Sequence, residues 1–316
     1  MPDTELDVPV DASAATDKAS WLDLISQIAA EEGYLQALGS QHWAMFVDDS
    51  PTLMVSFETI DQARNRPGQM PLAHHIAAAK GWSHLCILSD GQTWFRDPAV
   101  YAFFDRLVDE AFFDDFDAVL FYGAGPQAHA ACAYSVASPG ARILALNPVA
   151  TVNPGLAGWD DRFRAARKRD FTSRYGYAPD MVDGCAALTV ILDPTRKPDA
   201  MHAALFHAPY TTALHARFAG AEVETVLSRL GILNDVIIAA TEGRLTRASF
   251  ATLWRKRRDD GAYLKYLLND VELAGRKKLA IALCTNVVQR LRLNRFRKRL
   301  AELTDPAKSP APATAD

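Results

Sequence analysis

The stretch Asp117-Ala118-Val119-Leu120-Phe121-Tyr122-Gly123-Ala124-Gly125-Pro126-Gln127-Ala128-His129-Ala130-Ala131 decides the fold. An apolar run leads into a Gly-rich turn, and an Ala-rich segment follows the turn. This order predicts a buried strand, a tight corner and a helix. Gly123 and Gly125 suit the corner, because glycine adopts backbone conformations that are strained for other residues.

Apolar runs and helix-like segments alternate on both sides of this stretch. The runs lie at 43–47, 53–57, 85–88, 118–122, 143–146, 187–192 and 213–218. Nearly continuous apolar strands that alternate with helices of about 10 to 15 residues are typical of a mostly parallel sheet with both faces covered. The sequence therefore predicts a doubly wound α/β domain.

The ends of the chain predict further segments. We expect disordered tails at 1–18 and 304–316, an α/β body at 19–221 and a helical extension at 222–303. Within the body, 19–38 has the pattern of an amphipathic helix, and 43–47 with 53–57 has that of a β-hairpin. An insertion at 147–179 is long enough to form a lid over the strand ends. In the extension, 247–258, 262–274 and 277–300 resemble antiparallel helical pairs of tetratricopeptide type.

Composition favours a soluble, cytoplasmic protein. The chain has 316 residues, of which 49% are hydrophobic, enough for a large core. Its 4 cysteines lie far apart in sequence, which is typical of reduced thiols. The start of the chain lacks the pattern of a secretory signal, and no apolar run is long enough to cross a membrane. We expect neither a cofactor nor a metal ion.

Charge is unevenly distributed. The net charge is −4, yet the part between Arg244 and Arg299 carries 16 Lys and Arg against 4 acids. This asymmetry suggests two surfaces with different partners, or a basic segment that packs on an acidic body. Such a helical segment can bind phosphate backbones or an anionic membrane surface, and it can equally be a solvated helix face.

The strand, corner and helix around Gly125 resemble a nucleophile elbow of the α/β-hydrolase fold. The resemblance covers about 43–224 and is narrower to small hydrolase-like proteins with Tyr-Gly-x-Ser-x-Gly-Gly-Tyr-Ala elbows. It implies a triad in the chain order Ser, Asp or Glu, His. Gly125 matches the serine and Asp193 the acid, while Ala221 and Glu222 lie where a histidine is expected. The resemblance therefore implies a crevice kept for binding after serine chemistry was lost.

The predicted crevice supplies the candidate binding residues. Gly123, Gly125, Pro126 and Gln127 form a notch at a helix N-terminus, where backbone N–H groups can hold an anionic or carbonyl group. Two further candidates, Ser89 and Asp90, follow a strand at the crevice edge, with a plain loop turn as the alternative. A small molecule or a protein segment is the expected ligand.

A surviving catalytic base is the enzyme alternative, a hydrolase or transferase in which Asp193 and His202 form a pair. Asp199 lies three residues before His202, so the two side chains can also pair on one helix face. The competing interpretation makes the acids capping residues and His202 a buried partner. His129 either faces the crevice or lies on a helix surface.

Other reactive side chains carry less weight. Cys132 falls where the helix after the corner packs on the sheet, which favours a buried structural thiol. Cys284 lies within a predicted helix. His74 and His75 are adjacent and diverge by ~100° on a helix, so they cannot both face one metal.

The run from Gly81 to Pro98 is similar to a set of alphaproteobacterial proteins labelled phosphoadenosine phosphosulfate reductase. That resemblance implies a bacterial protein and thiol-dependent reduction of an activated sulfate. The reaction requires a Ser-Gly-Gly-Lys-Asp-type phosphate loop and a reactive Cys-Gly-Leu-His, and the sequence contains neither.

Overall fold

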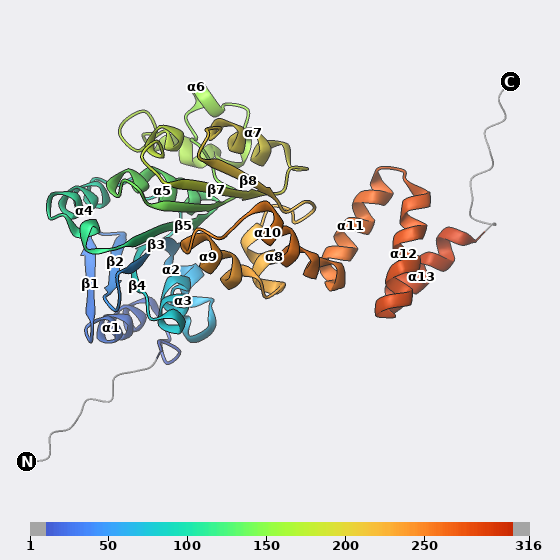
Figure 1. Cartoon of the computed structure of the whole chain (residues 1–316), viewed down its shortest axis with the longest axis horizontal. Coiled ribbons are helices and arrows are strands. Elements are labelled where there is room, and N and C mark those ends of the chain that lie inside the picture. The colour runs from blue at the N-terminus through green and yellow to red at the C-terminus, as the bar shows by residue number, and fades with distance from the viewer. Residues whose placement is uncertain (1–10, 306–316) are drawn as a thin grey trace, which may run out of the picture. The chain divides into compact units, whose positions relative to one another are not determined.

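The computed structural model describes residues 11–305, and its strands form one eight-stranded sheet (Figure 1). The strands are β1 (Gly33–Leu38), β2 (His42–Val47), β3 (Thr52–Thr59), β4 (Ser83–Ser89), β5 (Ala118–Ala124), β6 (Arg142–Leu146), β7 (Ala187–Leu192) and β8 (Thr211–His215). Their order is β1-β2-β4-β3-β5-β6-β7-β8. Only β2 pairs antiparallel with its neighbours, while all other pairings are parallel. The predicted fold class, a doubly wound and mostly parallel α/β sheet, is confirmed.

Helices cover both faces of the sheet, as the continuous apolar strands require. One face carries α4 (Pro98–Asp109), α5 (Pro126–Tyr134) and α7 (Lys197–Leu205). The other carries α1 (Lys18–Ala29), α3 (Leu72–Lys80), α8 (Val223–Arg229) and α9 (Leu233–Thr241). Figure 1 shows these two groups on opposite sides of the strands. The short α2 (Ile60–Arg64) and the turn η1 (Pro67–Gln69) follow β3.

The N-terminal part differs from two expectations. The helix predicted over 19–38 ends at Ala29, and β1 occupies the rest of that segment. Consequently β2 forms its hairpin with β1, whereas β3 is inserted between β4 and β5. The hairpin predicted for 43–47 and 53–57 is wrong. The two runs have similar apolar patterns, but a crossover separates them in the sheet.

The described part of the N-terminal tail is ordered by packing. Ala12 and Ala15 are buried beside Trp21 of α1, and the Asp17 carboxylate accepts the N–H of Ser20 as the helix cap. The expected tail therefore does not extend over 11–18. The remaining tail predictions, for 1–10 and 306–316, lie outside the described residues.

The insertion at 147–179 contains no strand. It holds α6 (Pro154–Ala157) and two 3₁₀ segments, η4 (Asp161–Lys168) and η5 (Ala178–Met181). Arg96, at the end of the loop after β4, fixes it with bonds to the carbonyls of Asp170 and Arg174 at 2.9 and 2.6 Å. The insertion is thus tied to the body by charged hydrogen bonds.

The C-terminal helices divide differently from the prediction. The first compact unit extends to Phe250 and includes α8 and α9, because these helices pack on the sheet. The expected boundary at 221 is therefore replaced by one near Phe250, within α10 (Arg247–Trp254).

The second unit contains η6 (Arg255–Asp259), α11 (Gly261–Leu273), α12 (Lys277–Leu291) and α13 (Asn294–Thr304). The single helix predicted over 277–300 is wrong. It breaks at Arg292, which has a positive φ of 52°. Within residues 11–305, none of the helices is both long and apolar enough to span a bilayer.

Candidate functional site

The chain turns sharply at Gly125, the corner between β5 and α5. Gly125 has φ 60° and ψ −123°, and its N–H donates to the carbonyl of Leu146 at 2.8 Å. A Cβ at Gly125 would meet nothing within 4 Å, so the side of the corner is open. At Gly123 a Cβ would lie 2.3 Å from the carbonyl oxygen of Gln127. Glycine is therefore required at the two positions for different reasons, which are close packing at Gly123 and a positive φ at Gly125.

Pro126 removes a group that acyl transfer at an elbow requires. The residue after the nucleophile donates its backbone N–H to the oxyanion, and proline has no N–H. Gln127 supplies the first N–H of the turn, and the amides of Ala128 and His129 donate to the Gly125 carbonyl at 3.1 and 3.4 Å. The expected notch of helix N–H groups is therefore poorer in donors than the sequence prediction held. The sequence already indicates the missing donor, because residue 126 is proline.

A crevice lies over the corner, at the carboxyl ends of the strands. Its volume is about 740 Å³. Of the four residues predicted to form the notch, Gly125, Pro126 and Gln127 line the crevice and Gly123 does not. Arg162 and Phe163 of the insertion form part of its wall. The insertion thus borders the crevice without filling it. Lining residues of both charges and several amides give it a polar interior: Asp61, Gln62, Asn65, Arg66, Gln92, Asn147, Arg196, Asp199, Glu222 and Glu224.

Ser89 and Asp90 are not among the lining residues, although both were candidates. The Ser89 hydroxyl donates to the Gly91 carbonyl at 3.0 Å, and Asp90 pairs with Lys18 at 2.6 Å. They form the loop turn that was the alternative. The two residues that follow, Gly91 and Gln92, line the crevice instead.

Asp193 is fully buried at the end of β7. One carboxylate oxygen accepts the backbone N–H and the hydroxyl of Thr195, at 3.0 and 2.8 Å. The other accepts the N–H of Gly220 at 2.9 Å. The acid therefore points to the loop where a triad histidine is expected, and a backbone amide takes the place of the imidazole. It acts here as a turn and loop anchor.

His202 is buried and uses both ring nitrogens. Nδ1 accepts the N–H of Ala150 at 3.3 Å, so Nε2 carries the proton and donates to Asp160 at 3.0 Å. Burial lowers the pKa of His202. The predicted pairs with Asp193 and Asp199 are wrong, because the partner acid comes from the insertion.

Asp199 belongs to a neighbouring network. It accepts hydrogen bonds from Arg162 at 2.5 Å, from Arg196 at 3.1 Å and from Asn147 at 3.1 Å. Arg162 also binds Asp160, at 2.7 Å. The network ties η4 of the insertion to α7. The third member of the predicted cluster, His207, is exposed and lies apart from these contacts.

His129 is buried under the insertion, so a helix-surface position is excluded. Its Nδ1 donates to the Val149 carbonyl at 3.0 Å, while Nε2 is buried without a partner. The ring packs against Trp94 and Phe171, with centroids 5.9 and 5.3 Å away. It does not line the crevice. Burial lowers the pKa of His129 to about 4.

Acid is expected to destabilise the body through His129. Its ordinary pKa is 6.5 and its folded pKa is about 4, so between these values the unfolded chain binds a proton that the folded one does not. This contribution is therefore complete above pH 6.5 and is lost as the pH falls toward 4, by at most about 1.4 kcal/mol per pH unit. Thermal melts between pH 7 and 4.5 should give a shallower pH dependence for His129→Gln than for the wild type. Equal slopes would contradict this assignment.

The sequence patterns did not predict a charged network at the crevice wall, in which Glu58 is buried and Arg66 and Glu224 are partly exposed. Arg66 binds Glu58 at 2.9 Å and Glu224 at 2.6 Å, and the Tyr122 hydroxyl donates to Glu224 at 2.8 Å. Glu58 also accepts the N–H of Leu72 at 2.7 Å. Glu58 could have indicated this network in the sequence, because a carboxylate directly after the apolar run 53–57 requires a partner if it is buried.

The remaining reactive side chains are structural. Cys132 and Cys284 are buried, and burial raises the pKa of Cys132. His74 bonds to His84 across 3.2 Å while His75 bonds to the Pro67 carbonyl, so the adjacent histidines diverge as predicted. Within residues 11–305, no three His, Cys, Asp or Glu side chains form a group that could hold a metal ion.

Comparison with known proteins yields only structural likenesses. No family model matches the sequence, and no curated protein matches it. The esterase domain of a Rhodothermus marinus protein is 12% identical with a TM-score of 0.41, over 63% of this chain and 92% of that one. The S-formylglutathione hydrolase of Agrobacterium tumefaciens is 12% identical with a TM-score of 0.40, over 66% and 92%. Brefeldin A esterase, a bacterial homologue of human hormone-sensitive lipase, is 14% identical with a TM-score of 0.41, over 77% and 89%. None of these likenesses concerns a sulfate reductase.

Proposed function

We propose that this α/β-hydrolase-like protein binds a polar ligand in the crevice over Gly125 and does not hydrolyse it by serine chemistry. The observation that carries the proposal is the corner itself. Gly125 keeps the elbow backbone but offers no nucleophile, and Pro126 offers no N–H for an oxyanion. The nucleophile and the oxyanion donor serve different steps of acyl transfer. A single substitution would remove only one of them, so the absence of both favours a binding role.

The surroundings of the corner support the same proposal. The Asp193 carboxylate accepts the N–H of Gly220. A backbone amide therefore lies where the imidazole of a triad histidine would bind this acid. The crevice remains open, with about 740 Å³ of space. Its arginines and carboxylates favour a ligand that is rich in hydrogen-bonding groups, such as a polar small molecule or a protein segment.

Serine-hydrolase activity is expected to be absent from the wild type and also from Gly125→Ser. The added hydroxyl has room at the corner but lacks a general base and the oxyanion N–H of residue 126. Release of nitrophenol from short-chain nitrophenyl esters and labelling by a fluorophosphonate check both proteins. Wild-type hydrolysis that disappears in Gly125→Val would overturn the proposal. Gly125→Ala, which leaves the crevice open, controls for damage to the fold.

A further inference from the structure

We propose that the turn between α11 and α12 docks the protein on the surface of an anionic lipid bilayer. The turn has the sequence Leu273-Ala274-Gly275-Arg276-Lys277-Lys278-Leu279, and all seven residues are exposed. Leucines flank three consecutive basic residues, so apolar and cationic groups share one tip. This segment is called the basic tip below.

The leucines of the basic tip are unusually accessible. Leu273 is 81% exposed and Leu279 52%. Buried apolar side chains of the same two helices, such as Leu264, Leu268 and Val287, lie farther from the turn. A large apolar side chain kept in water at a turn gains free energy when a partner covers it, at roughly 25 cal/mol per Å² buried.

The positive charges of the basic tip lie at the N-terminus of α12, where they destabilise that helix. Arg276 is the N-cap of α12, and Lys277 and Lys278 form its first turn. A helix N-terminus already carries partial positive charge, so cations there are unfavourable and add to the local positive potential. Nearby, the carboxylate of Glu272 is paired with Arg299 at 2.6 Å, which leaves the tip strongly cationic.

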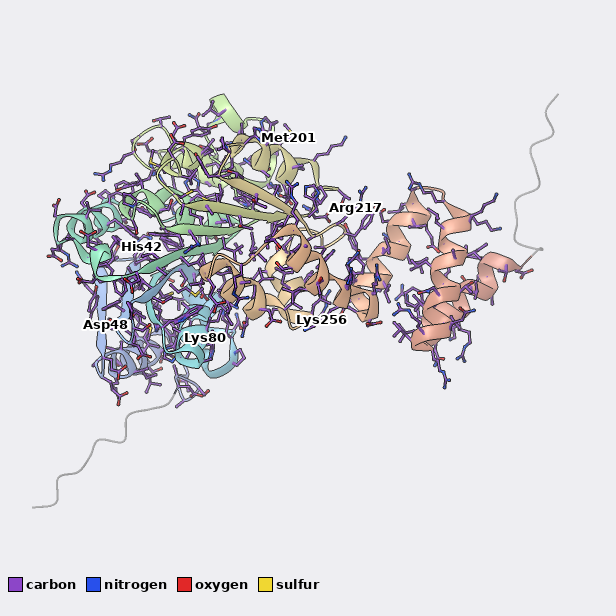
Figure 2. All side chains as sticks on the ribbon, viewed as in Figure 1. His42, Asp48, Lys80, Met201, Arg217 and Lys256 are labelled. Carbon is purple, nitrogen blue, oxygen red and sulfur yellow. The ribbon has the colours of Figure 1, made fainter. Side chains whose placement is uncertain are left out.

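The whole unit reinforces this potential. Residues 251–305 contain 14 Lys and Arg against 6 Asp and Glu. Figure 2 shows nitrogen-tipped side chains projecting from the helices of this unit. Anionic lipid headgroups attract such a surface, with a gain of about 1 kcal/mol per Lys or Arg close to the membrane.

A bilayer suits the basic tip better than the other anionic or apolar partners. A second copy of the tip would bring like charges together, which opposes self-association. A nucleic acid would engage the arginine and lysines through its phosphates but would leave the leucines in water. A bilayer accepts both groups, since leucines enter the boundary between headgroups and acyl chains while cations contact phosphates.

Sedimentation of the full chain with vesicles tests the proposal. We expect binding to vesicles of phosphatidylcholine with phosphatidylserine, little binding to phosphatidylcholine alone, and weakening by salt. Replacing Arg276 and Lys278 by Gln should lower the affinity about 30-fold, since two contacts of about 1 kcal/mol are lost. Replacing Leu273 and Leu279 by Ser should lower it about tenfold.

The matched control replaces Arg255 and Arg258 by Gln. It removes the same charge from η6, at the opposite end of α11, and should lower the affinity less than about threefold. All three changes are at exposed positions, so circular dichroism melts should show no loss of stability. Failure to bind anionic vesicles overturns the proposal. Equal losses in the control and the tip variants do so too, as does binding to duplex DNA that needs the cations and ignores the leucines.

Discussion

Gly123→Ala should destabilise the body by about 4 kcal/mol or more. Losses of this size are typical of a steric clash that the surrounding packing cannot relieve. Gly123 is buried in β5, and its added Cβ would lie 2.3 Å from the carbonyl oxygen of Gln127. That oxygen belongs to the backbone of α5, which is buried along most of its length and cannot shift alone. The methyl group would therefore force apart the strand and helix that form the elbow.

Gly125→Ala is the matched control for Gly123→Ala. Its Cβ would meet nothing within 4 Å, so only the strained φ of 60° costs stability, about 1 to 2 kcal/mol. Urea unfolding followed by tryptophan fluorescence gives both values. If Gly123→Ala does not fold, its soluble yield and its resistance to protease are compared with those of Gly125→Ala. Stabilities within 1 kcal/mol of each other would contradict the packing role of Gly123.

The sheet was predictable where its strands are continuous and buried. The runs at 85–88, 118–122, 143–146 and 187–192 all lie in strands, because a strand covered on both faces has apolar residues throughout. β1 was missed since it is an edge strand with mostly half-exposed residues, and its sequence continues the pattern of the preceding helix. The hairpin was assigned to the wrong strands because neighbouring runs do not reveal a crossover.

The site was predictable only at the corner. Gly123, Gly125 and their spacing predict the tight corner, and Gln127 follows from its place on the first turn of α5. The partner of His202 was not predictable, because Asp160 lies 42 residues away on an insertion without regular strands. Arg66 and Glu224 are separated by 158 residues. Only the fold brings Arg66 and Glu224 together at one wall of the crevice.

The Arg66 network gives the second large effect. Arg66→Met should destabilise the protein by about 3 to 5 kcal/mol at pH 7, because it leaves the carboxylates of Glu58 and Glu224 without their shared cation. Arg164→Met is the control. Its ion pair with Asp161 joins side chains that are 70% and 60% exposed, so its loss should leave the free energy of unfolding almost unchanged.

The pH dependence identifies Glu58 as the source of the Arg66→Met penalty. Burial raises the pKa of Glu58 above 4.5, and Arg66 opposes that rise. A carboxyl with a raised folded pKa stabilises the folded state below that pKa and loses this advantage as the pH rises through it. Without Arg66 the pKa of Glu58 rises further, so the penalty should be largest at neutral pH and should shrink toward pH 4.5. Adding Glu58→Gln should remove most of the pH dependence. A penalty that is constant with pH would show that Arg66 acts through packing, because protonation neutralises a carboxylate but does not restore lost packing.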